Sequence, residues 1–166
     1  MTPARRTILL SLAAAGTLAL AGCAKQGDAV PAVPIGTITG QQIQTADFKG
    51  KVTLVNFWAT DCVTCVKEMP MLVDTYNKFK PRGYETVAVA MKHDRPDFVL
   101  HFAETRKLPF KVALDPKGEV ALAWNNTRVT PTSYLVNKRG EIVKRYVGEP
   151  EVAEFHATIE KLLAES

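Results

Sequence analysis

Residues 51–70 read KVTLVNFWATDCVTCVKEMP, and this stretch predicts a strand that passes directly into a helix. Residues 51–58 are rich in β-branched and aromatic side chains and are bounded by glycine and polar residues, which indicates a buried strand. Over residues 62–80, apolar residues recur at three- and four-residue spacing, the period of a helix. The cysteines Cys62 and Cys65 therefore lie where the strand hands over to the helix.

The rest of the chain continues to alternate between the two periods. Further strands are predicted at residues 84–91, 111–114, 133–136 and 141–147, and further helices at residues 96–107, 119–124 and 150–164. A strand, a helix and a strand in succession form a parallel βαβ unit. The pattern therefore predicts an α/β fold, with a central mixed sheet of about five strands flanked by helices on both faces.

The first residues predict export. Arg5 and Arg6 precede an apolar run over residues 8–21, which is the order of charges and apolar residues in a secretory signal. The run ends Leu-Ala-Gly-Cys at Cys23, and this ending resembles a bacterial lipobox. The resemblance implies that residues 1–22 are removed and that Cys23 carries the lipid. An ordinary signal with a chance cysteine is the alternative.

The domain organisation follows from that reading. Residues 23–35 contain two prolines among small and polar residues, and we expect them to form a lipid-anchored linker. Residues 36–166 then form one domain of ordinary size. Removal of the two arginines lowers the net charge from +4 to +2, and a charge this small gives no reason to expect a nucleic-acid partner.

The three cysteines divide into the lipobox residue and one C-x-x-C pair. Unpaired N–H groups and the positive end of the helix dipole stabilise a thiolate at a helix start, so Cys62 should be the attacking sulfur. Cys65, one turn along, should close the disulfide and release the substrate. Three other readings remain: a structural staple, which gains little from so short a loop, half of a zinc site, and two inert thiols.

Two segments together carry a resemblance to a known family. Residues 55–70, VNFWATDCVTCVKEMP, and residues 129–136, VTPTSYLV, followed by KRGEI at 138–142, resemble the active-site stretch and the cis-proline loop of TlpA/ResA-type thioredoxin-like proteins. The similarity covers residues 36–165. It implies a thioredoxin-like fold and thiol–disulfide exchange at Cys62 and Cys65.

The resemblance also assigns roles to single residues. It implies that the Thr130–Pro131 bond is cis, lies against Cys62 and offers backbone groups to a substrate peptide. It implies that Glu68, in a C-x-x-C-x-x-E pattern, tunes the thiols and moves the Cys65 proton, whereas a solvated helix charge is the alternative.

Three further positions near the cysteines bear on this reading. Trp58 is expected to line the substrate site, unless it fills the core beneath the site. Thioredoxin has a buried aspartate where this chain has Asn56, which moves proton handling towards Glu68. Asp61, before the first cysteine, places a negative charge that would disfavour the Cys62 thiolate.

The implied function is reduction of exported protein disulfides on the periplasmic side of a bacterial membrane. The family implies a DsbD- or CcdA-like membrane electron donor, and clients such as apocytochrome c cysteines or copper-site cysteines. We expect a monomer with no cofactor and no bound metal. The alternatives are a Cu(I) metallochaperone that uses Cys62, Cys65 and a third ligand such as His93, or a thiol peroxidase.

Overall fold

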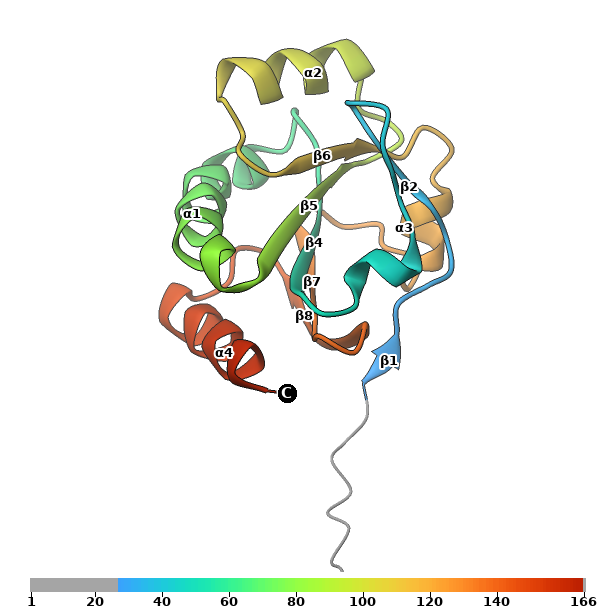
Figure 1. The fold of residues 1–166 in the computed structure, drawn as a ribbon. Helices are drawn as coiled ribbons and strands as arrows, with labels where there is room; N and C mark the ends of the chain where they lie inside the picture. The colour runs from blue at the N-terminus through green and yellow to red at the C-terminus, as the bar shows by residue number, and fades with distance from the viewer. Residues whose placement is uncertain (1–26, 166) are drawn as a thin grey trace, which may run out of the picture.

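The computed structural model describes residues 27–165, and the predictions about the signal and about Cys23 fall outside this range. The chain folds around one eight-stranded sheet whose order is β1-β8-β7-β4-β5-β6-β2-β3 (Figure 1). The strands are β1 (Asp28–Ala29), β2 (Ile35–Thr37), β3 (Gln42–Ile43), β4 (Val52–Trp58), β5 (Tyr84–Ala90), β6 (Lys111–Leu114), β7 (Thr132–Val136) and β8 (Glu141–Val147).

The helices cover both faces of this sheet. They are α1 (Val63–Phe79), α2 (Pro96–Thr105), α3 (Glu119–Ala123) and α4 (Val152–Ala164), with short 3-10 helices η1 (Thr45–Phe48) and η2 (Lys80–Arg82). Buried residues of α1, α2 and α4 share one apolar cluster with one face of β4, and α3 and η1 share a second cluster with the other face. The expected α/β class is therefore confirmed.

The sheet is mixed because β4, β5 and β6 are parallel neighbours, whereas β7 runs antiparallel to both of its neighbours, β4 and β8. All seven residues of β4 are buried, since its two faces lie under helices on either side. The carboxyl ends of β4, β5 and β6 and the start of β7 meet at one edge of the sheet. Loops at that edge can approach Cys62, which follows β4.

The expected number of five strands is wrong. The five predicted strands are all present, but three short strands lie outside them, β1 beyond β8, and β2 and β3 beyond β6. These strands are two or three residues long, so the sequence has no alternation to reveal them. They are defined by pairing: β1 with β8, β2 with β6, and β3 with β2.

Part of the expected linker also belongs to the fold. Asp28 and Ala29 form β1 and pair with Ile142 and Glu141 of β8, and Val30 is buried against the second apolar cluster. A linker was expected over residues 23–35 because prolines and small residues dominate this segment. The pairing shows instead that the folded part begins by residue 28.

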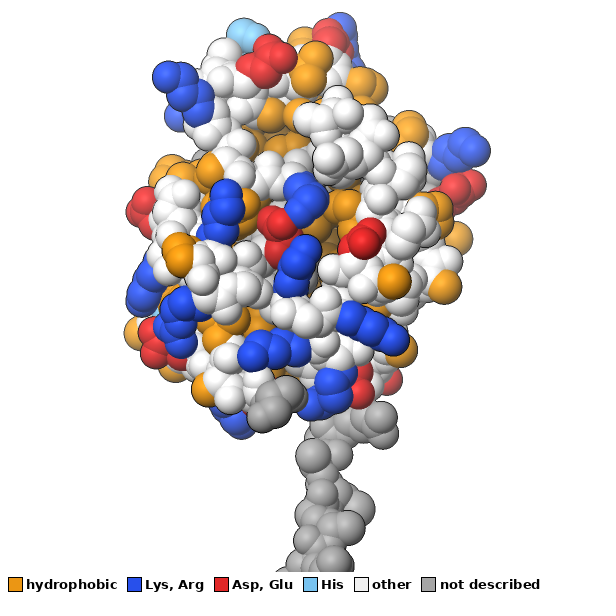
Figure 2. All heavy atoms as spheres, viewed as in Figure 1, with side chains coloured by type: hydrophobic (Ala, Val, Ile, Leu, Met, Phe, Trp, Pro, Cys, Tyr) orange, Lys and Arg blue, Asp and Glu red, His pale blue; other side chains and the backbone are white. Residues whose placement is uncertain are grey.

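The surface carries charges of both signs. Figure 2 shows lysine and arginine side chains interspersed with acidic ones over the face drawn in Figure 1. Within residues 27–165, no helix is both long and apolar enough to cross a membrane.

Candidate redox site

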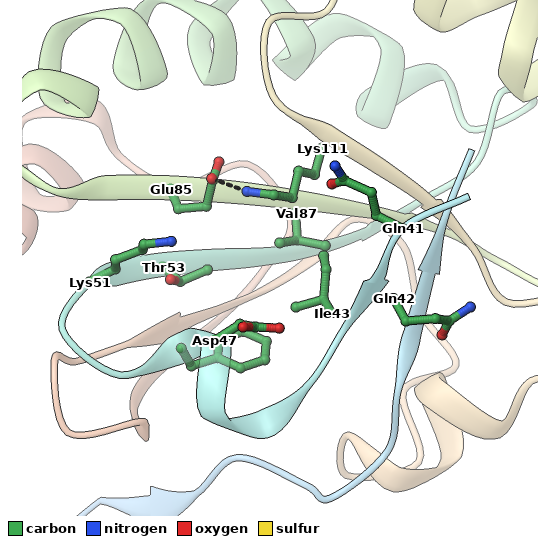
Figure 3. Close-up of a pocket in the computed structure, with 10 residues that line it drawn as sticks. Gln41, Gln42, Ile43, Asp47, Lys51, Thr53, Glu85, Val87 and Lys111 are labelled. Carbon is green, nitrogen blue, oxygen red and sulfur yellow. Dashed lines mark hydrogen bonds and ion pairs between the residues drawn. The ribbon is translucent and has the colours of Figure 1, made fainter. Parts of the chain in front are cut away.

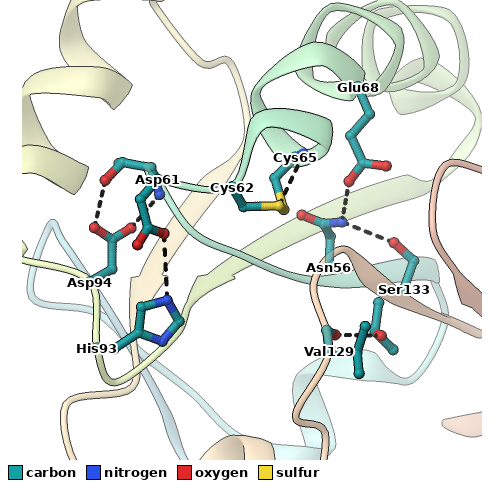
Figure 4. The surroundings of a disulfide bond; sticks show 11 residues. Asn56, Asp61, Cys62, Cys65, Glu68, His93, Asp94, Val129 and Ser133 are labelled. Carbon is teal, nitrogen blue, oxygen red and sulfur yellow. Dashed lines mark hydrogen bonds and ion pairs between the residues drawn. A yellow bond between two sulfur atoms is a disulfide. The ribbon is translucent and has the colours of Figure 1, made fainter.

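Cys62 and Cys65 form a disulfide at the start of α1 (Figure 4). Cys62 is the N-cap residue, with extended backbone, and its Sγ accepts a hydrogen bond from the backbone N–H of Cys65 at 3.2 Å. This is the helix-end donor that stabilises a negatively charged sulfur. Cys62 is half-buried, whereas Cys65 has no exposed surface, so a large substrate can approach only the first sulfur.

The loop before β7 lies at the same edge of the sheet. The Thr130–Pro131 bond is cis, as the resemblance implied. Thr132, which follows, pairs with Phe57 near the end of β4, and Gly148 N–H donates to the Pro131 carbonyl at 2.8 Å. These pairings place the proline loop beside the end of β4, from which Cys62 follows.

Glu68 is not a solvated helix charge, which was the alternative to a role at the thiols. Its side chain has no exposed surface, and its Oε1 accepts a hydrogen bond from Asn56 Nδ2 at 2.8 Å. The same Nδ2 donates to Ser133 Oγ at 3.0 Å. In Figure 4 the Asn56 amide lies between the disulfide and the Glu68 carboxyl group. The burial has a simple cause: with Cys65, Met69 and Leu72, Glu68 follows helical spacing on the buried side of α1.

Burial also changes the acidity of Glu68. Its pKa is raised from 4.5 to about 7: loss of solvent is the main cause, the hydrogen bond from Asn56 opposes it, and the charge of Glu149 adds to it. Glu68 Oε2 and Asn56 Oδ1 are buried without a hydrogen-bond partner among the described residues. A carboxyl group with this pKa can both accept and return a proton at neutral pH.

Trp58 does not line a substrate site. It is fully buried, and its ring packs against Phe102 of α2 with 5.1 Å between the centroids. Because side chains alternate along β4, Trp58 points to the same face as Leu54, the face that α1 and α2 cover. Its place is the core beneath the cysteines.

Asp94, to which the sequence assigned no role, and His93, named only as a possible copper ligand, contact the turn between β4 and α1. Asp94 accepts hydrogen bonds from Thr60 N–H and Thr60 Oγ1, both at 2.6 Å, and His93 Nε2 lies 3.5 Å from Asp61 Oδ1 (Figure 4). The negative charge of Asp61 beside Cys62 thus has a neighbouring imidazole. The contact between these two loops could have been predicted, because the loops that follow parallel neighbours such as β4 and β5 lie at the same edge of the sheet.

The copper reading finds little support in this arrangement. His93, its suggested third ligand, faces Asp61 rather than a sulfur (Figure 4). Between residues 27 and 165, no three His, Cys, Asp or Glu side chains are grouped closely enough to hold a metal ion.

A polar hollow of about 430 Å³ lies away from the cysteines (Figure 3). It is lined near the amino-terminal ends of β4 and β5, the opposite edge from Cys62, by residues that include Lys51, Thr53 and Glu85. Glu85 forms an ion pair with Lys111 inside the hollow, which neutralises both charges. This hollow contributes no group to the redox site.

Comparisons with known proteins agree with this geometry. Residues 25–162 match the family model described as Redoxin. The thiol-disulfide oxidoreductase ResA of Bacillus anthracis is 33% identical over 137 residues, which cover 82% of this chain and 78% of the relative. ResA of Bacillus subtilis strain 168 is 33% identical over 123 residues, covering 74% and 68%.

Solved structures show the same likeness. A putative thioredoxin from Neisseria meningitidis superposes with a TM-score of 0.79 at 37% identity, covering 84% of this chain and 93% of that one. A putative thiol:disulfide interchange protein DsbE from Chlorobium tepidum superposes with a TM-score of 0.75 at 26% identity, covering 84% and 99%.

Proposed function

This chain belongs to the Redoxin family and is a thiol–disulfide oxidoreductase of the TlpA/ResA type, and from that premise we propose that it reduces disulfides in proteins outside the cytoplasm. The observation that carries the proposal is the pairing of a half-exposed Cys62 with a buried Cys65 on the same helix as a buried carboxyl group, Glu68. The membrane anchor at Cys23, the DsbD- or CcdA-like donor and clients such as apocytochrome c or copper-site proteins are parts of this proposal.

The reaction starts from the reduced protein. The Cys62 thiolate attacks one sulfur of the client disulfide, a Cys62–client bond forms, and the other client sulfur leaves as a thiolate that takes a proton from water. Cys65 then loses its proton and attacks Cys62 Sγ, which breaks the Cys62–client bond and expels the second client sulfur as a thiolate that takes a proton from water. The client leaves as a dithiol, and Cys62 and Cys65 are left as the disulfide. Two electrons pass to the client, and the membrane donor must return two to the protein.

Glu68 is suited to the second step. Cys65 is buried, so the proton that it must lose has few acceptors nearby. Glu68 lies one helical turn further along α1, and its pKa of about 7 makes the carboxylate a fair acceptor at neutral pH. Asn56 and Ser133 hold the carboxyl group in place through the shared Nδ2 group.

The direction of exchange is tested by the reduction potential of the Cys62–Cys65 pair in glutathione and dithiothreitol buffers. We expect a potential more negative than about −260 mV, below the glutathione range, because a reductase must give electrons to its clients. A potential near −120 mV, the range of strong oxidants, would mean that the protein oxidises its clients instead.

The role of Glu68 is tested by a rate–pH profile of Glu68→Gln against a model protein disulfide. Exchange should slow by about 10-fold or more at pH 7. General acid–base catalysis usually contributes about 100-fold or more, so a loss of this size is a modest expectation. Glu104→Gln, a change at an exposed carboxyl group on α2, is the matched control. Superimposable profiles for Glu68→Gln and the native protein would remove Glu68 from the mechanism.

A further inference from the structure

A basic groove adjoins the redox site. It has a volume of about 460 Å³ and is lined by Met91, Lys92, His93, Lys117, Gly118, Ala121, Leu122, Asn126, Thr127 and Arg128. Four of these side chains are basic, and no aspartate or glutamate is among them. We call this feature the basic groove.

Two residues of the basic groove lie close to the two parts of the redox site. His93, at one side, faces Asp61, the residue before Cys62, at 3.5 Å. Arg128, at another, precedes the Thr130–Pro131 bond by two residues. The loops after β5 and β6, α3 and the segment before β7 supply the lining, and the loops after β5 and β6 lie at the edge where β4 ends.

The cationic groups of the basic groove are available to a ligand. None of the ion pairs found among residues 27–165 includes Lys92, Lys117 or Arg128. Arg128 Nε donates only to the neutral Asn126 side chain, at 3.3 Å. The nearby Asp115 is buried and accepts backbone N–H groups at the start of α3, so its charge is already engaged.

Apolar surface accompanies the charge. Leu122, which lines the basic groove, is 65% exposed, and Val129, next to Arg128, is 57% exposed. Exposed apolar side chains beside unpaired cations suit a polypeptide that carries both carboxylates and an apolar residue. A small inorganic anion would leave Leu122 and Val129 uncovered.

We propose that the basic groove binds an acidic segment of the client polypeptide, next to the disulfide that Cys62 attacks. The inference rests on the proposed function, and it adds the class of client that the site prefers. Complementary charge raises the rate of encounter and sets the register of the bound segment, so it should act mainly on the second-order rate constant.

The experiment uses the reduced protein and two disulfide-containing peptides of equal length. One carries aspartate and glutamate with a single leucine beside the disulfide, and the other carries serine and asparagine with the same leucine. At low ionic strength we expect the acidic peptide to react about 10-fold faster or more, and the preference to shrink as sodium chloride is added. Neutral hydroxyethyl disulfide reports whether exchange itself occurs.

Two double variants with reversed charges test whether the preference for the acidic peptide arises in the basic groove. In Lys117→Glu/Arg128→Glu the ratio of acidic to neutral peptide rates should fall to about one or below. Lys80→Glu/Arg82→Glu makes the same change of charge in η2, at the far end of α1 from Cys62, and should keep the preference. Thermal melts of both variants check folding.

The outcomes separate the two proposals. Equal rates for the two peptides, or an equal loss of preference in both variants, would overturn the basic groove as a client site while exchange with hydroxyethyl disulfide still stands. Suppression of the preference by phosphate, but not by chloride at matched ionic strength, would mean that the basic groove holds a free oxyanion instead. Absence of exchange with every disulfide would overturn the proposed function itself.

Discussion

Among single residues, Glu68 links the chemistry of the cysteines to the stability of the fold. Its carboxyl group is buried, and its pKa is about 7 in the folded protein against 4.5 as its ordinary value. The folded state therefore binds the proton more tightly than the unfolded state. The stability that this proton contributes is fully present below about pH 4.5. It is lost as the pH rises through 7, where the buried carboxyl group must ionise.

Glu68→Gln should remove this dependence, because glutamine keeps the shape and accepts the Asn56 hydrogen bond without ionising. At pH 8 the oxidised variant should be more stable than the native protein by up to about 3 kcal/mol, the value of a shift of this size. At pH 4.5 the two should differ little. Denaturation with urea at both pH values measures the difference. Parallel stability curves would show that Glu68 is solvated.

The unequal exposure of the two cysteines supports a second prediction. Cys65→Ser should trap mixed disulfides with clients through Cys62, because the resolving thiol is missing. Cys62→Ser should trap few, since Cys65 has no exposed surface. Non-reducing gels of extracts that contain each variant reveal the adducts. More adducts with Cys62→Ser would exchange the roles of the two sulfurs.

At the scale of elements, the turn from β4 to α1 depends on the loop after β5. Asp94, from that loop, receives two hydrogen bonds from Thr60 (Figure 4). Both come from a residue two positions before Cys62, so Asp94 also positions the start of α1. The active-site turn is thus held by the loop after β5 as well as by its own hydrogen bond from Cys62 N–H to the Ala59 carbonyl.

Asp94→Ala should lower the free energy of unfolding by about 1.5–3 kcal/mol, the usual contribution of hydrogen bonds to a charged group. Asp94→Asn keeps one acceptor oxygen and should lose less. Asp97→Ala, at an exposed carboxylate that pairs with Arg95, is the control and should stay within about 0.5 kcal/mol of the native protein. Urea denaturation measures all three. Equal effects of Asp94→Ala and Asp97→Ala would show that the Thr60 contacts are not stabilising.

For the whole molecule, the place of β1 constrains how a lipid anchor could present the domain. β1 pairs with the start of β8, whereas the end of β8 pairs with Thr132 beside the proline loop. Cys23 precedes Asp28 by five residues, a span of at most about 18 Å even when fully extended. An anchor at Cys23 would therefore hold the domain close to the membrane, with the cysteines at the edge away from it.

The anchor itself is a prediction that cell fractionation tests. The native protein should be found with membranes, and Cys23→Ser should be released into the soluble fraction or remain unprocessed, because stable attachment requires the acyl chains. Cys65→Ser, which keeps Cys23, is the control for the loss of a cysteine. A soluble native protein would contradict the lipid anchor.

The central elements and the redox pair follow from local sequence alone. Residues 51–70 place the C-x-x-C motif between a strand and a helix, and this order depends only on the local pattern of apolar residues. The structure has β4 and α1 within one residue of the predicted ends. The cis state of Thr130–Pro131 was implied by resemblance, since base rates for proline would not have predicted it.

Which groups face one another depends on how distant parts of the chain pack together. The Asn56 link between Glu68 and Ser133 joins residues up to 77 positions apart, and Asp94 reaches Thr60 across 34 positions. The short edge strands exist because a neighbour offers them hydrogen bonds, not because of their own sequence. Burial of Glu68 depends on what covers α1, and its pKa follows from that burial. Local periodicity reports which side of an element is apolar, whereas the partner on that side is set by chain topology.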